Sequence, residues 1–144
     1  MFAVDTNIFL YAHFEQFSQH KKARIFCKDL LTNTKPWCMG WQVYYEYLRI
    51  TTHSRILLRP LSINDALADL QPYLELDTLY ILSHTAQHRQ ISSDLFSQIK
   101  SAKGNFIHDC HYAALLKEYG VKILYTADMD FKKFNFLEVI DPTV

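Results

Sequence analysis

The chain has 144 residues, 49% of them hydrophobic and 15% aromatic, which suits one domain spanning residues 1–144 around a single core. Its 15 lysines and arginines balance its 15 aspartates and glutamates, and a net charge of zero gives no argument for a polyanionic partner. No apolar run approaches the ~18 residues of a membrane span, and the N-terminus lacks a signal-peptide pattern, so we expect a cytoplasmic protein without membrane association.

Apolar residues are grouped in two ways along the chain. Short apolar runs indicate buried strands, while longer segments with apolar residues three or four positions apart are typical of helices. In chain order the predicted elements are a strand at residues 1–4, helices at 7–12 and 19–32, a strand at 35–39, helices at 41–52 and 62–74, a strand at 79–82, helices at 91–100 and 106–119, and strands at 122–126 and 137–140.

Several residues mark the expected helix ends. Thr6 is the predicted cap of the first helix, and Ser62 with Asp65 resembles a capping box, with aspartate in place of the preferred glutamate or glutamine. Residues 104–105 provide a break and a cap, and Gly120 suits the C-terminal end of the last helix. Strands alternating with helices, over connections long enough for parallel crossovers, predict a three-layer α/β/α fold.

Acidic residues stand where such a fold brings the chain to one point. Asp5 directly follows the first predicted strand, and Asp128 and Asp130 follow the fourth. In open α/β sheets, ligands bind past the carboxyl ends of the strands. Glu46 and Asp109 lie on predicted helices and complete the expected cluster.

Clustered carboxylates need a cation, because two unit charges ~4 Å apart repel by about 4 kcal/mol at an effective dielectric near 20. Mg²⁺ and Mn²⁺ prefer hard oxygen ligands, so a site of several carboxylates suits either ion better than zinc. Such an ion can activate water and hold the oxygens of a phosphodiester, which makes hydrolysis of a phosphate ester the predicted chemistry. The sequence contains no G-x-S-x-G elbow and no G-x-x-x-x-G-K-[ST] loop that would offer an alternative.

Each acid also has a simpler explanation when taken alone. Asp5 could cap the following helix, Glu46 could be a solvated helical residue, and Asp109 could complement a helix dipole. Asp128 and Asp130 could form a turn after a strand. The metal-site prediction therefore depends on their occurring together at equivalent ends of the fold.

Histidines and cysteines form no recognisable metal motif in the sequence. His108 and His111 flank Asp109 without the H-E-x-x-H spacing, so structural or surface roles are favoured over ligation. The three cysteines are an odd number without a C-x-x-C pair. This argues against a disulfide framework and a zinc ribbon, and it predicts buried thiols.

Four motifs together carry a family resemblance. They are Val4-Asp5-Thr6-Asn7, Glu46 within Tyr45-Glu46-Tyr47-Leu48-Arg49, Asp109 within residues 104–115, and Thr126-Ala127-Asp128-Met129-Asp130-Phe131. In this order and at these separations, the chain resembles a PIN domain, specifically a VapC-type toxin ribonuclease of a bacterial toxin–antitoxin pair. The resemblance extends over essentially the whole chain.

The resemblance implies a central, mainly parallel five-stranded sheet and a Mg²⁺- or Mn²⁺-dependent endoribonuclease that cleaves RNA with metal-activated water. It also implies a homodimer and inhibition by a cognate VapB-type antitoxin. The residues matching the family's catalytic and metal-binding acids are Asp5, Glu46, Asp109 and Asp128, with Asp130 as an auxiliary metal ligand. The residues matching its polar helpers, expected to hold the carboxylates by hydrogen bonds, are Thr6, Asn7 and Thr126.

Residues outside the acidic cluster are candidates for contacts with RNA. Arg49, Lys132 and Lys133 could bind phosphates, although a solvated surface also explains their charge. The chain departs from the family pattern after the third acid, where larger side chains are expected to alter the packing beside the site without removing an acid. These departures are at Cys110, His111 and Tyr112.

The sequence leaves three other functions open. Asp128-Met129-Asp130 also resembles the D-x-D of haloacid-dehalogenase-type phosphatases, but that motif normally stands early in the chain. The acids could instead hold a metal only for stability in a non-catalytic scaffold. A PIN-fold nuclease that processes RNA without acting as a toxin is the third alternative.

Overall fold

The computed structural model describes residues 1–144, which form six α-helices, one short 3-10 helix and one five-stranded sheet. The strands are β1 (Phe2–Val4), β2 (Trp37–Gly40), β3 (Leu79–Leu82), β4 (Ile123–Tyr125) and β5 (Glu138–Ile140). The helices are α1 (Thr6–His13), α2 (His20–Thr32), α3 (Trp41–Thr51), α4 (Ile63–Leu74), α5 (His88–Gln98) and α6 (Phe106–Glu118), with the 3-10 helix η1 at Met129–Lys133. All the predicted strands and helices are present, whereas η1 was not predicted.

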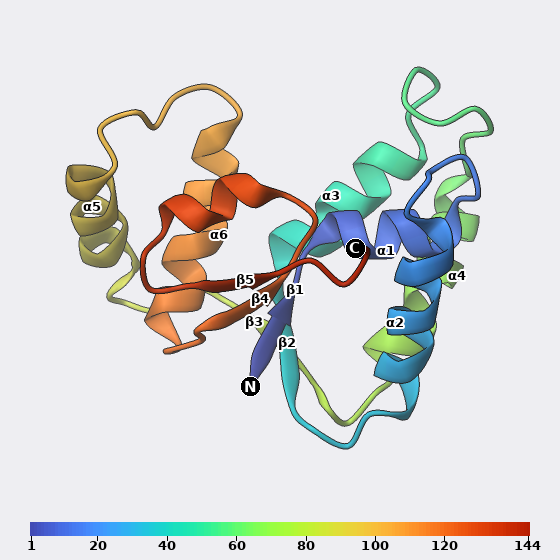
Figure 1. Ribbon diagram of the computed structural model, residues 1–144, viewed down its shortest axis with the longest axis horizontal. Helices are drawn as coiled ribbons and strands as arrows, with labels where there is room; N and C mark the ends of the chain where they lie inside the picture. Colours follow the sequence, from blue (N-terminus) through green and yellow to red (C-terminus); the bar gives the residue numbers. More distant parts are fainter.

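The five strands form one sheet in the order β3-β2-β1-β4-β5, and every neighbouring pair is parallel. Helices α5 and α6 lie on one side of the strands and α1, α2 and α4 on the other (Figure 1). The predicted three-layer α/β/α fold with a central parallel sheet is confirmed. Strands covered on both faces are expected to be apolar throughout, and all four residues of β2 are buried.

The register of the two central strands brings distant parts of the chain together. Val4 of β1 pairs with Tyr125 of β4, and the amide of Asp5 donates a hydrogen bond to the Tyr125 carbonyl at 3.0 Å. Asp5 and Thr126 therefore leave the sheet side by side, although 121 positions separate them in sequence. The acidic motifs at Asp5 and after Thr126 thus meet at the carboxyl edge of the sheet.

Helix α6 is fixed against the sheet by a buried tyrosine. The Tyr112 hydroxyl donates a hydrogen bond to the backbone carbonyl of Val4 at 2.8 Å, at the last residue of β1. Asp109 lies three positions earlier on the same helix, so this bond also sets the distance between Asp109 and the end of β1. The departure from the family pattern at Tyr112 therefore serves packing beside the site.

The helix ends agree only partly with their predicted caps. Ser62 caps α4 by accepting from the Asp65 amide at 3.1 Å, as predicted. The cap of α1 is Asp5 rather than Thr6, because the Thr6 hydroxyl is engaged elsewhere. Asn105 makes no side-chain capping bond to α6.

The cysteines meet a further expectation. All three cysteines are buried and free, as predicted. None of the helices combines the length and apolarity that a membrane crossing requires.

We predict that Gly120→Ala destabilises the protein by about 1–2 kcal/mol. Gly120 has a φ of 66°, in the left-handed region, where the Cβ of an alanine would crowd its own peptide backbone. Gly120 follows α6, where its amide and that of Val121 donate to the carbonyls of Lys117 and Leu116. The free energy of unfolding in urea measures the loss. Gly120→Asn, which tolerates this conformation better, should lose less, and equal losses for the two variants would contradict the explanation.

Candidate active site

Asp5 is the most deeply buried of the candidate acids, with 8% of its surface exposed. Its Oδ1 accepts from the Thr6 amide at 2.7 Å. Its Oδ2 accepts from the Thr126 hydroxyl at 2.7 Å and from the Asn7 side-chain amide at 2.9 Å. A carboxylate offers about four lone-pair positions, so these three bonds orient Asp5 and still leave it capacity for a cation.

Thr126 and Asn7 extend this network to the loop after β4. The Asn7 side-chain amide also donates to the Thr126 hydroxyl at 2.9 Å, and its carbonyl accepts from the Ala127 amide at 3.1 Å. The Asp128 amide donates to the Thr126 hydroxyl at 3.0 Å. The loop that carries Asp128 is therefore held to the first turn of α1 by side chains, and its position depends on the same hydroxyl that orients Asp5.

Glu46 is held from the same turn of α1. The Thr6 hydroxyl donates to Glu46 Oε2 at 2.8 Å, which links α1 to the middle of α3. The predicted helpers Thr6, Asn7 and Thr126 therefore all contact a predicted acid or its loop. Glu46 is oriented toward the site rather than being an ordinary solvated residue.

The remaining three acids approach one another most closely. Carboxylate oxygens of Asp109, Asp128 and Asp130 all lie within 4.8 Å of one another. Asp128 also caps η1, where its Oδ1 accepts from the Asp130 amide at 2.9 Å. Lys133 contacts Asp130 Oδ1 at 3.1 Å and is the one cation in an ion pair with these acids.

The acids surround two adjoining hollows on the surface. One is lined by Asp5, Glu46 and Asp109, and the other by Glu46, Asp109, Asp128 and Asp130. The shared walls join the two hollows into a single candidate site. Residues lining both hollows are Glu46, Arg49, His108 and Asp109.

Burial and mutual repulsion disfavour the ionised acids. Burial raises the pKa of Asp5 to about 7, and the charges of Glu46 and Asp109 add to this against the hydrogen bonds from Thr126 and Thr6. Burial and the charge of Asp128 likewise raise the pKa of Asp109 to about 6. The protein itself therefore supplies little positive charge to offset the cost of ionising these two carboxylates.

A hard divalent cation fits this donor set. All the converging groups are carboxylates, which Mg²⁺ and Mn²⁺ favour, and one carboxylate triad is close enough to share an ion. The pKa values of Asp5 and Asp109 are raised by burial and, to a smaller extent, by neighbouring carboxylates, and such an ion would offset both effects. The site can therefore hold a metal and expose it to a ligand in the adjoining hollow.

Comparison with known proteins agrees with this geometry. Residues 2–137 match the sequence profile of the PIN domain. The chain belongs to the PIN domain family. This PIN domain is 29% identical to Ribonuclease VapC33 of Mycobacterium tuberculosis over 142 residues, which cover 99% of this chain and 98% of that protein. It is also 29% identical to Ribonuclease VapC43 of the same organism, over 95% of this chain and 92% of that protein.

Solved structures share the fold. The crystal structure of VapC20 from Mycobacterium tuberculosis, a toxin that cleaves the sarcin-ricin loop, aligns with a TM-score of 0.69 at 16% identity and covers 96% of this PIN domain and 98% of that chain. VapBC2 from Rickettsia felis, bound to a promoter DNA fragment, aligns with a TM-score of 0.66 at 17% identity, covering 96% of each chain. At these identities the likeness concerns the fold.

The predicted RNA-binding residues differ in their positions. Arg49 lines both hollows of this PIN domain, and Lys133 borders them through Asp130. Lys132 is exposed and lines neither hollow. Gln42 was not predicted, yet it lines the hollow beside Asp5 with a buried side-chain nitrogen that has no hydrogen-bond partner. A glutamine in the first turn of a helix gives no sequence signal of this role.

We predict that this PIN domain, freed of metal with a chelator, becomes less stable as pH rises from about 4 through 7. Between its unfolded and folded pKa values, a carboxyl group with a raised pKa holds a proton in the folded state that the unfolded state has released. The stability that this proton contributes is complete below about pH 4 and is lost as the pH rises through the folded pKa of about 7. The loss for Asp5 is roughly 2–4 kcal/mol. Urea unfolding at pH 5 and pH 8 measures it.

Asp5→Asn should reduce this pH dependence and leave the part that the raised pKa of Asp109 contributes, whereas Asp29→Asn, at an exposed acid, should leave the whole dependence in place. A wild-type slope that persists in Asp5→Asn would show that other groups carry the pH dependence.

Proposed function

We propose that this protein is a Mg²⁺- or Mn²⁺-dependent endoribonuclease and the toxin of a type II toxin–antitoxin pair. The observation that carries the proposal is the gathering of five acids from four segments of the chain around the two adjoining hollows of a PIN domain. The names of its relatives, VapC ribonucleases matched along almost their whole lengths, support RNA as the substrate. These acids are Asp5, Glu46, Asp109, Asp128 and Asp130.

The proposed metal ligands are the close triad of Asp109, Asp128 and Asp130, with Asp5 and Glu46 beside it. A bound divalent ion lowers the pKa of water and stabilises charge on a phosphodiester. The chain's own contribution is orientation: Thr126 holds both Asp5 and the Asp128 loop, and Thr6 holds Glu46. Carboxylates that are already held in position do not have to rearrange when charge develops on the substrate.

The hollow also offers groups for the RNA backbone. Arg49 lines both parts and can bind a phosphate in a bidentate manner. Gln42 lines the hollow beside Asp5 as well, although its side-chain nitrogen is buried. Lys133, already paired with Asp130, completes the positive rim. We assign Lys132 a weaker role, because it lines neither hollow and, unlike Lys133, forms no ion pair with one of the acids.

The toxin role adds two proposed partners, a VapB-type antitoxin and a second copy of the chain. Two of the fold relatives, VapBC2 and FitAB, were solved as complexes on DNA, which supports an antitoxin for this chain as well. An RNA-processing nuclease without a toxin role is the second candidate. Growth after expression alone distinguishes the two, because only a toxin arrests growth and is neutralised by its co-expressed antitoxin.

We predict that Asp5→Asn, Asp109→Asn and Asp128→Asn each reduce RNA cleavage at least about 100-fold, because each removes a negative charge that would hold the ion against the phosphodiester. Cleavage of total cellular RNA followed by sequencing of the new ends measures the loss. Asp29→Asn, at an exposed acid outside the hollows, is the matched control and should retain activity. Undiminished cleavage by the three variants, or cleavage in excess chelator, would refute a metal-dependent nuclease. A stabilising effect of Mg²⁺ without any cleavage would instead support the scaffold alternative.

We further predict that Thr126→Val weakens the apparent affinity for Mg²⁺ or Mn²⁺ by roughly 10–100-fold, because it releases Asp5 and Asp128 from their shared hydroxyl. The metal concentration at half-maximal cleavage is the measurement. Because valine preserves the shape of threonine, maximal activity at saturating metal should fall much less than the affinity. Thr52→Val is the control, since its exposed hydroxyl contacts only its own helix. A normal metal requirement in Thr126→Val would exclude this orienting role.

A further inference from the structure

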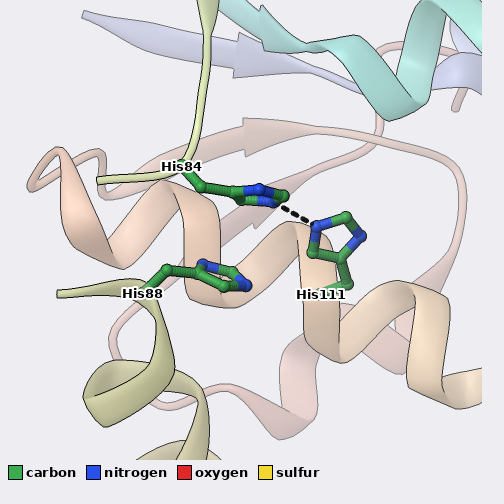
Figure 2. A group of neighbouring side chains, drawn as sticks. All are labelled: His84, His88 and His111. Atoms are coloured by element: carbon green, nitrogen blue, oxygen red, sulfur yellow. Dashed lines mark hydrogen bonds between the residues drawn. The ribbon is translucent and has the colours of Figure 1, made fainter. Parts of the chain in front are cut away.

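Three histidines form a second cluster beside the acidic site. His84 lies in the loop after β3, His88 is the first residue of α5, and His111 lies on α6. Figure 2 shows the three rings grouped around a common point, with a nitrogen of His84 directed at His111. Ring nitrogens of all three lie within 4.8 Å of one another, and the Nε2 atoms of His84 and His111 are 2.6 Å apart.

A buried carboxylate orients one of these rings. His88 Nδ1 lies 2.6 Å from Glu118 Oε2, and the Glu118 side chain is fully shielded from solvent. Glu118 also accepts from the backbone amide and the hydroxyl of Thr85 at 2.9 and 2.7 Å. Because a carboxylate accepts, His88 must carry its proton on Nδ1, which leaves the lone pair on Nε2 available.

We propose that His84, His88 and His111 bind a transition-metal ion of the Zn²⁺ class, with solvent or a ligand at the fourth position. Three neutral imidazoles from separate elements are a donor set that such ions favour and that Mg²⁺ does not. A carboxylate that accepts from the second nitrogen of a metal-binding histidine is a common support in zinc sites, and Glu118 has that position.

The spacing of the nitrogens allows an ion after a small movement. Metal–nitrogen bonds near 2.0–2.1 Å place tetrahedral nitrogens about 3.3 Å apart, so the 2.6 Å contact between His84 and His111 has to open. In the metal-free state one of these two rings carries its proton on Nε2 and donates a hydrogen bond to the other ring. When an ion binds, that ring carries its proton on Nδ1 instead, so that Nε2 can bind the ion. His84 is exposed and lies in a loop, so it has the freedom to move.

The proposed site is independent of the nuclease proposal. Its ligands are nitrogens and those of the acidic site are oxygens, so the two sites select different ions. His111 lies two positions from Asp109 on α6, while His84 and His88 belong to α5 and its preceding loop. An ion at the histidines would therefore tie α5 to the helix that carries Asp109, and metal binding should raise the melting temperature.

The test titrates the metal-free protein with Co²⁺ in excess Mg²⁺, which occupies the acidic site. Cobalt with nitrogen ligands in a four-coordinate site absorbs visible light far more strongly than six-coordinate cobalt on oxygens. We expect one strongly absorbing equivalent that Zn²⁺ displaces. Substitution of His84, His88 or His111 by alanine should weaken binding at least about 10-fold, and Glu118→Gln should weaken it by roughly 10–100-fold. His53→Ala, at an exposed histidine outside the cluster, is the control.

X-ray absorption of the Zn²⁺-loaded wild type gives a result that needs no variant, because imidazole ligands have a characteristic scattering pattern. Nitrogen scattering from about three imidazoles supports the site even if an alanine variant fails to fold. Oxygen-only scattering, binding that is lost in Asp128→Asn but retained in His88→Ala, or the absence of saturable binding would overturn the proposal. The last outcome would identify the three histidines as a hydrogen-bonded cluster only.

Discussion

The buried carboxylate of Asp5 and its bond to Thr126 determine how the site is assembled. This 2.7 Å bond joins residues at the ends of the two central strands, and the same hydroxyl receives the Asp128 amide. Asn7 adds two more bonds between the same strand ends, one to the Thr126 hydroxyl and one from the Ala127 amide. The carboxylate pays a desolvation cost that raises its pKa to about 7, and these hydrogen bonds offset only part of it. A cation in the adjoining hollow would relieve the remainder, so the residue that joins the two strand ends is also one that favours a bound metal.

The parallel sheet makes this arrangement possible. Parallel strands that share one direction place all their carboxyl ends at one edge, and helices begin from that edge. Asp5 has two roles at this edge, because it caps α1 and also lines the hollow. Tyr112 then fixes α6 to the last residue of β1, which brings Asp109 to the same edge. Packing and chemistry are therefore coupled, and a substitution at Tyr112 would move an acid as well as open the core.

Helix α6 carries one residue of each of the two proposed metal sites. Asp109 presents hard oxygen to the hollow beside α3, while His111 presents imidazole nitrogen to the loop before α5. Ion selectivity follows from donor type, so neighbouring sites can take different metals without competing. The proposed histidine site would stabilise α5, whose contacts in the fold are mainly with α6.

The amino-acid sequence by itself determined the order and type of the main elements, because apolar spacing, the Ser62 cap and Gly120 are local signals. It also identified the acids, since strand ends and family motifs can be recognised from short stretches of sequence. The single domain over residues 1–144, the roles of the site residues and a cytoplasmic location stay predictions. Tertiary structure alone decided that Asp109, Asp128 and Asp130 form a close triad among the predicted acids, and that His84, His88 and His111 meet. The physical reason is that these contacts depend on strand register and helix packing, which join residues far apart in sequence and leave no local pattern.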